Sequence, residues 1–127
     1  DLSTATNLST MFGNALLFNN GGVSLNWAGG FGNNANLFFM FGYTSAFNQD
    51  ISDWDVTNVT NMERMFLTST AYNNGGVALD WSNTANVTKM GNIVNNATAF
   101  NQDIDTWDIS SVLICTICLI MPRLLIA

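Results

Sequence analysis

The sequence predicts an α/β fold, a right-handed solenoid with a parallel strand ladder on one side and short helical turns on the other. Two observations predict it. Four tryptophans, Trp27, Trp54, Trp81 and Trp107, recur at a nearly constant spacing, and a period in this range is typical of stacked repeats. Within each repeat, the hydrophobic pattern changes from alternation to helical spacing. An all-β solenoid of short strands is the alternative, because so short a helix is marginal without packing.

The tryptophans lie in four windows of two alternating forms. The longer form reads FNNGGVSLNW from Phe18 and YNNGGVALDW from Tyr72, and the shorter form reads FNQDISDW from Phe47 and FNQDIDTW from Phe100. Glycine pairs in the longer form supply the positive φ angles that a tight turn needs. The repeats account for residues 1–112, about four coils that open in mid-repeat.

One repeat shows how strand and helix are expected to follow each other. Ile51, Trp54 and Val56 alternate with aspartates, which predicts a short strand. The apolar residues after it are Val59, Met62, Met65 and Phe66. Their spacing predicts one face of a short helix, capped by Thr57 or Asn58. Stacking is expected to bury a repeated core, consisting of the four tryptophans with Phe47, Phe100, Met62 and Phe66.

Composition argues against several functions. Charged residues make up 9% of the 127 residues, and the net charge of −6 rests on nine acidic and three basic side chains. No basic surface for nucleic acid is therefore expected. Histidine, the most frequent general base and metal ligand, is absent. We predict that the chain is not an enzyme.

Two groups of aspartates are candidate binding residues. They are Asp50, Asp53 and Asp55 in one repeat and Asp103, Asp105 and Asp108 in another. Carboxylates along one edge could collect Ca²⁺, a hard cation with oxygen ligands. The favoured interpretation is structural, because aspartate caps turns and keeps a strand surface soluble. No cofactor and no metal site are predicted.

Asparagines form a second candidate set. Asn7, Asn58, Asn86 and Asn96 begin N-x-S/T sequons, which matter only in a secretory pathway that glycosylates. Rows of asparagine and threonine could also bind glycans or ice. The favoured interpretation is that stacked amides bond to one another between coils.

The string FNQDISDWDVTNVTNMERMF from Phe47 resembles a bacterial surface-protein repeat of about 26 residues. This repeat occurs in BspA-like leucine-rich-repeat proteins and in mycoplasma surface lipoproteins. The resemblance covers most of the chain and implies a leucine-rich-repeat-like solenoid at a cell surface, active in adhesion and protein contact. It offers no catalytic residues. The NNGG windows depart from its pattern by replacing QDI.

The residues 113–127 read LICTICLIMPRLLIA and break the repeat. They are too short and too interrupted for a membrane span. A DNA string that encodes VTDMYDMFDNATAIN, a fitting next repeat, yields VLICTICLIMPRLL after deletion of one base. We therefore interpret this tail as a frameshifted repeat. Its Cys115 and Cys118 lack the further ligands that a zinc site needs.

The sequence thus predicts a non-catalytic module at a cell surface or outside the cell, which binds a protein or glycan partner through repeated Asp, Asn and Thr. The alternative is a structural subunit that self-associates end to end into a filament, because uncapped repeat ends expose apolar surface.

Overall fold

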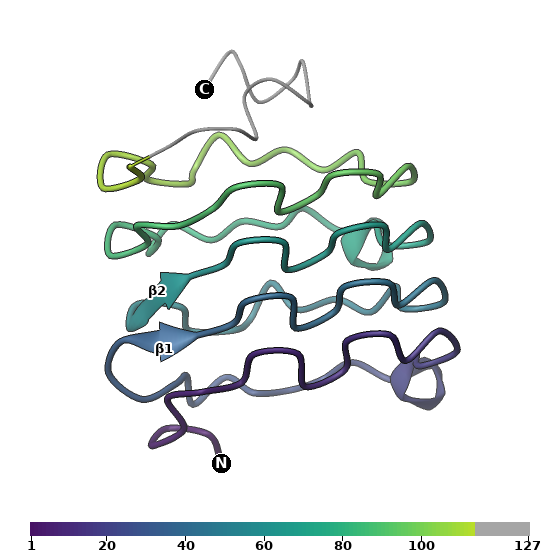
Figure 1. Cartoon of the computed structure of the whole chain (residues 1–127), viewed down its shortest axis with the longest axis horizontal. Helices are drawn as coiled ribbons and strands as arrows, with labels where there is room; N and C mark the ends of the chain where they lie inside the picture. The colour runs from purple at the N-terminus through teal and green to yellow at the C-terminus, as the bar shows by residue number, and fades with distance from the viewer. Residues whose placement is uncertain (114–127) are drawn as a thin grey trace.

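The computed structural model describes residues 1–113 and corrects the predicted fold class (Figure 1). Over these residues there is no α-helix, and only two short strands are present, β1 (Ala35–Asn36) and β2 (Val59–Asn61), paired in parallel. Two single 3₁₀ turns, η1 (Asn20–Gly22) and η2 (Asn74–Gly76), complete the regular elements. The leucine-rich-repeat-like α/β solenoid is therefore wrong, and so is the all-β alternative. Most of the backbone is irregular.

Successive repeats nevertheless lie against one another in layers (Figure 1). Backbone N–H groups of one layer donate to backbone carbonyls of the next layer. The Leu8 N–H donates to the Asn36 carbonyl at 2.9 Å. The Leu37 N–H donates to the Asn61 carbonyl at 2.9 Å, and the Met62 N–H donates to the Lys89 carbonyl at 2.8 Å. Isolated parallel bridges join Asn7 to Asn36 and Asn61 to Lys89. The four segments 7–14, 36–43, 61–68 and 89–96, here called the turn rows, thus stack in register. We call the four repeats layers one to four in chain order.

The predicted helix is replaced by consecutive turns. In the third turn row the Met65 N–H donates to Met62 O at 3.2 Å, and the Leu67 N–H donates to Arg64 O at 3.1 Å. Arg64 and Thr68 are left-handed, with φ of 57° and 56°. Alternate N–H groups donate to the next layer; the Arg64 N–H, for example, donates to the Gly91 carbonyl at 2.9 Å. Those donors are unavailable for the i−4 bonds of a helix.

The predicted strand around Trp54 is also absent. The Trp54 N–H closes a turn on the Ile51 carbonyl at 3.1 Å, and the strand of this repeat is β2, at the start of the predicted helix. Apolar residues at 62, 65 and 66 are completely buried in spite of this. The apolar spacing therefore identified the buried side chains correctly but predicted a helical backbone where the structure has consecutive turns.

Two columns of aromatic rings form the core. Phe18, Phe47, Tyr72 and Phe100 are stacked with ring centroids 5.8 Å apart at each step. In the second column Phe12, Phe41 and Phe66 follow at 5.3 and 5.5 Å. The columns touch within each of the first three layers, as Phe66 and Tyr72 do with ring centroids 3.8 Å apart. Offset stacking and burial of large rings make these columns the main apolar contact between layers.

The NNGG windows adopt the left-handed turns predicted from their glycines. Gly21 and Gly75 have φ of 62° and 63°, and the preceding Asn20 and Asn74 have φ of 48° and 51°. The two turns are therefore copies of one conformation, two layers apart.

The predicted boundary at residue 112 lies at the end of the described chain. Residues 114–127, which include Cys115 and Cys118, lie outside the described residues, so the frameshift remains a prediction. Leu113 is described: its N–H donates to the Thr88 carbonyl at 3.1 Å, and that of Thr88 donates to the Thr60 carbonyl at 2.9 Å. Leu113 thus stands at the register position that threonine occupies in the two preceding layers.

Candidate functional site

A polar groove of about 490 Å³ crosses three layers at the start of the turn rows. Its lining consists only of amides and hydroxyls: Asn33, Asn34, Asn58, Thr60, Asn86 and Thr88. It runs from the residues just before β1 over β2 to the equivalent segment of the next layer. None of the residues within 1–113 that line it is charged, which agrees with a chain so poor in charge. We call it the Asn/Thr groove.

Interlayer hydrogen bonds hold part of the groove rigid. The Asn58 amide Nδ2 donates to the Phe31 carbonyl at 3.1 Å, and the Asn86 Nδ2 donates to the Thr57 carbonyl at 2.8 Å. Each asparagine therefore ties its layer to the preceding one and leaves its amide oxygen without a protein donor among residues 1–113. Asn33 and Thr60 make no side-chain hydrogen bond there. Free amide and hydroxyl groups both donate and accept, so the groove can bind neutral polar ligands.

From the sequence, Asn58 and Asn86 are sequon asparagines and Asn58 is also a candidate helix cap, whereas Asn33, Asn34, Thr60 and Thr88 are not singled out. The recurring NVT in residues 58–60 and 86–88 was the available signal. Asn33 and Asn34 lie outside the aligned words, so only the layered fold brings them to this edge.

The candidate aspartates act largely on their own backbone. Oδ1 of Asp50, Asp55, Asp103 and Asp108 accepts the N–H two residues further on, at 2.9 to 3.0 Å. Asp53 and Asp105 have no such side-chain bond within residues 1–113. Asp50 and Asp103 therefore share one repeated turn-closing position, and Asp55 and Asp108 share another, rather than converging on one point.

Two of these carboxyls have a shifted pKa. Hydrogen bonds from the Thr57 hydroxyl and backbone, with a further one from Asn83, lower the pKa of Asp55. Those from Ser110 lower the pKa of Asp108. Hydrogen bonds to the carboxylate stabilise its charged form, so both carboxyls are ionised in neutral solution.

No three acidic or cysteine side chains come together into a metal-holding group within residues 1–113. The suggested Ca²⁺ edge therefore has no structural counterpart there.

Three of the tryptophans connect one layer to the next. The indole Nε1 of Trp54, Trp81 and Trp107 donates to the carbonyl of Leu25, Ile51 and Leu79, at 2.7, 3.2 and 2.9 Å. These three are at most 5% exposed, whereas Trp27 in the first layer is half-buried. These three tryptophans are structural, because each satisfies a buried carbonyl in the preceding layer.

The four sequon asparagines are exposed. Asn58 and Asn86 line the Asn/Thr groove, and Asn7 closes a turn by accepting the Ser9 hydroxyl at 2.6 Å. The amide nitrogens of Asn58 and Asn86, the atoms that carry an N-glycan, already donate between layers.

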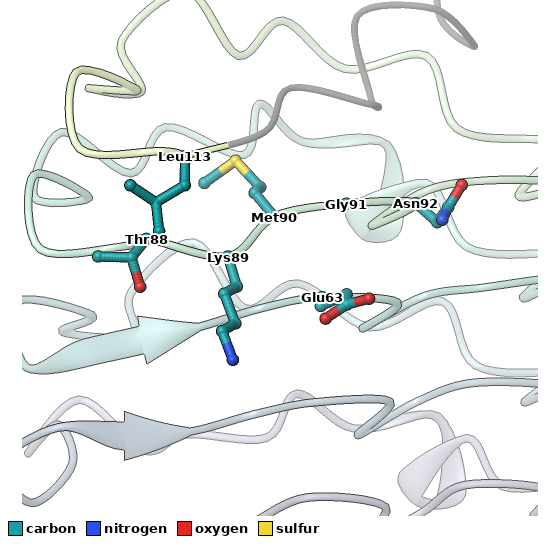
Figure 2. A pocket seen from close by; sticks show the side chains of 7 residues that line it. All are labelled: Glu63, Thr88, Lys89, Met90, Gly91, Asn92 and Leu113. Atoms are coloured by element: carbon teal, nitrogen blue, oxygen red, sulfur yellow. The ribbon is translucent and has the colours of Figure 1, made fainter.

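An apolar hollow of about 260 Å³ lies beside the last turn row (Figure 2). It is lined by Glu63, Thr88, Lys89, Met90, Gly91, Asn92 and Leu113. Among the described residues of this lining, Glu63 and Lys89 are the charged side chains, and the Thr88 hydroxyl donates to the Thr60 carbonyl at 3.3 Å. Leu113, one of its walls, is the last described residue.

Across the described residues, no helix is long and apolar enough to cross a membrane.

The stacked layers and the polar edge define a class of repeat protein in which one short segment is reused to build a continuous surface. A family described as "Mycoplasma protein of unknown function, DUF285" matches residues 1–82 and 77–117. The chain therefore belongs to that family. No curated protein and no solved structure matches it.

Proposed function

We propose that this chain is a non-catalytic binding module of a cell-surface or secreted protein, and that the Asn/Thr groove binds a neutral glycan. The single observation that carries the proposal is the groove's uninterrupted lining of amides and hydroxyls over three stacked layers. The resemblance to BspA-like and mycoplasma surface repeats supports a surface position and a role in adhesion.

The chemistry of the groove favours sugars over charged ligands. Sugar hydroxyls both donate and accept hydrogen bonds, as the groove's amides and hydroxyls do. With no lysine or arginine in the lining, an anionic ligand would lose its solvation without gaining a counter-charge. The fixed positions of Asn58 and Asn86 reduce the entropy lost on binding.

The experiment is binding of the full chain to a panel of immobilised neutral and acidic oligosaccharides. Asn33→Ala combined with Thr60→Val removes two groove groups that have no side-chain partner within residues 1–113. We expect neutral oligosaccharides to bind and this variant to lose at least tenfold in affinity, with an unchanged unfolding temperature. Thr70→Val, which alters an exposed threonine outside the groove, is the matched control.

The second candidate function is a structural subunit that stacks end to end into a filament. The exposed apolar residues of the first layer, Leu16 at 56% and Leu17 at 90%, favour it. Absence of binding to every oligosaccharide, together with regular threads in electron microscopy, would replace the glycan-binding proposal by this one.

A further inference from the structure

The outer face of layer one exposes groups that are buried in every other layer. Phe12, Phe18 and Trp27 are half-buried, while Phe41 and Phe47, their counterparts in layer two, are completely buried. What would cover this face can be worked out from the interfaces inside the molecule, because the two window forms alternate and make two kinds of interface.

Where an NQDI window lies on an NNGG window, glutamine makes the contact. The Gln49 Nε2 donates to Asn19 Oδ1 at 2.9 Å. Between layers three and four, the Gln102 Nε2 donates to Asn73 Oδ1 at 3.0 Å. The same pair of residue types is thus used at both interfaces of this kind.

Where an NNGG window lies on an NQDI window, a buried asparagine makes the contact. Asn74 Oδ1 accepts the Ile51 N–H at 2.8 Å, and its Nδ2 donates to Asp50 Oδ1 at 3.3 Å. The same amide bonds within its own layer, to the Val77 carbonyl at 3.0 Å. The neighbouring Trp81 donates to the Ile51 carbonyl at 3.2 Å.

Layer one has an asparagine and a tryptophan at the positions of Asn74 and Trp81. Asn20 matches Asn74 in φ, 48° against 51°, and in its bond within the layer, Nδ2 to the Val23 carbonyl at 2.8 Å. Trp27 stands in the place of Trp81. No residue within 1–113 pairs with the Asn20 Oδ1 or the Trp27 Nε1. In layer three, the corresponding atoms of Asn74 and Trp81 bond to the backbone of Ile51.

We propose that the outer face of layer one is a docking face for a repeat coil of the NQDI form, with Asn20 accepting its Ile N–H and Trp27 donating to the carbonyl of the same Ile. The interface between layers two and three supports this assignment, because Asn20 and Trp27 repeat the positions of Asn74 and Trp81. The proposal goes beyond glycan binding, because it specifies how coils follow one another and holds whatever the groove binds.

A coil of the NNGG form fits the same face less well. The place of Ile51 is taken there by Leu79, whose carbonyl accepts the Trp107 indole at 2.9 Å. The residue before it is Ala78, where the NQDI form has Asp50, the residue whose carboxylate accepts the Asn74 amide at 3.3 Å. Asn20 would therefore lose this charge-assisted hydrogen bond against an NNGG coil, so the face favours the NQDI form.

The test joins one extra coil to the full chain ahead of Asp1. One fusion carries residues 28–54, which contain the NQDI window, and the other carries residues 55–81, which contain the NNGG window. The two additions are equal in length and both are rich in apolar residues. We expect the NQDI fusion to raise the unfolding temperature at least twice as much as the NNGG fusion.

Asn20→Ala supplies the specific readout. This substitution is expected to abolish most of the rise in unfolding temperature of the NQDI fusion and to change the unfolding temperature of the NNGG fusion little. In the NQDI fusion, hydrogen exchange at the Trp27 indole N–H, resolved by NMR, is expected to slow at least tenfold. An equal rise in unfolding temperature from both fusions would overturn the proposal. An unchanged exchange rate of the Trp27 indole N–H in a folded NQDI fusion would also overturn it.

Discussion

Replacing Asn48 by alanine removes one clamp between layers two and three. Asn48 Oδ1 accepts the backbone N–H of Asn73 at 2.7 Å and that of Gly75 at 3.0 Å. Asn73 is half-buried, so its N–H loses a partner that water replaces only in part, whereas the exposed Gly75 N–H can bond to solvent. An unsatisfied buried donor costs about 1–3 kcal/mol.

We therefore expect Asn48→Ala to lower the free energy of unfolding by about 2 kcal/mol. For a domain of this size this corresponds to a fall of roughly 8 °C in the unfolding temperature. Urea denaturation followed by tryptophan fluorescence measures the loss as a lower midpoint with an unchanged slope.

Two variants make this measurement specific. Asn48→Asp keeps an oxygen acceptor in the same place and is expected to retain most of the stability. Asn95→Ala makes the same change where the side chain has only a local contact, to Asn92 at 3.4 Å. The reasoning is refuted if Asn48→Ala and Asn95→Ala lower the stability equally.

Four further predictions follow from backbone strain, close packing, titration and the tail. Arg64→Gly relieves a left-handed residue at φ 57° and is expected to raise the free energy of unfolding by about 0.5–1 kcal/mol; a loss in urea denaturation would contradict this. Gly32→Ala places a Cβ 2.8 Å from the Thr4 carbonyl oxygen and should lower the unfolding temperature, whereas Gly29→Ala, with 3.9 Å to its nearest neighbour, should not. The lowered pKa of Asp55 adds stability that is present above its unfolded value and lost as the pH falls through its folded value; Asp55→Asn should therefore flatten the acid side of the stability profile, and an unchanged slope would count against it. Replacing residues 113–126 by TDMYDMFDNATAIN should raise the unfolding temperature by at least about 4 °C, while a scrambled version of the same replacement should not.

The sequence predicted the repeat well but the backbone poorly. The nearly constant tryptophan period identified what stacks on what, because stacking requires equivalent side chains one repeat apart. The apolar positions Met62, Met65 and Phe66 fitted a helix and a run of turns equally well. What distinguishes them is the left-handed backbone of Arg64 and Thr68, and neither residue type signals that conformation.

One feature of the candidate site was predictable from the repeat, and another was not. Asn19, Asn48 and Asn73 form a row in which each Oδ1 accepts the backbone N–H of the asparagine in the next window. This row was foreseeable, because every window places an asparagine directly after its aromatic residue, as Asn48 follows Phe47. The Asn/Thr groove was not, since Asn33 and Asn34 lie in a connection between windows. Their proximity to Asn58 and Asn86 depends on the path of the chain between layers, which a repeat alignment leaves open.

Alternate N–H groups of the first three turn rows bond to the next layer instead of forming a helix. Scalar couplings across hydrogen bonds, measured by NMR on labelled protein, distinguish the two arrangements. We expect couplings from the Phe41 nitrogen to the Met65 carbonyl carbon and from the Phe66 nitrogen to the Ile93 carbonyl carbon, since these bonds are 2.9 and 2.8 Å long. A coupling from the Phe66 nitrogen to the Met62 carbonyl carbon, four residues back, would show a helix and overturn the layered arrangement of the turn rows.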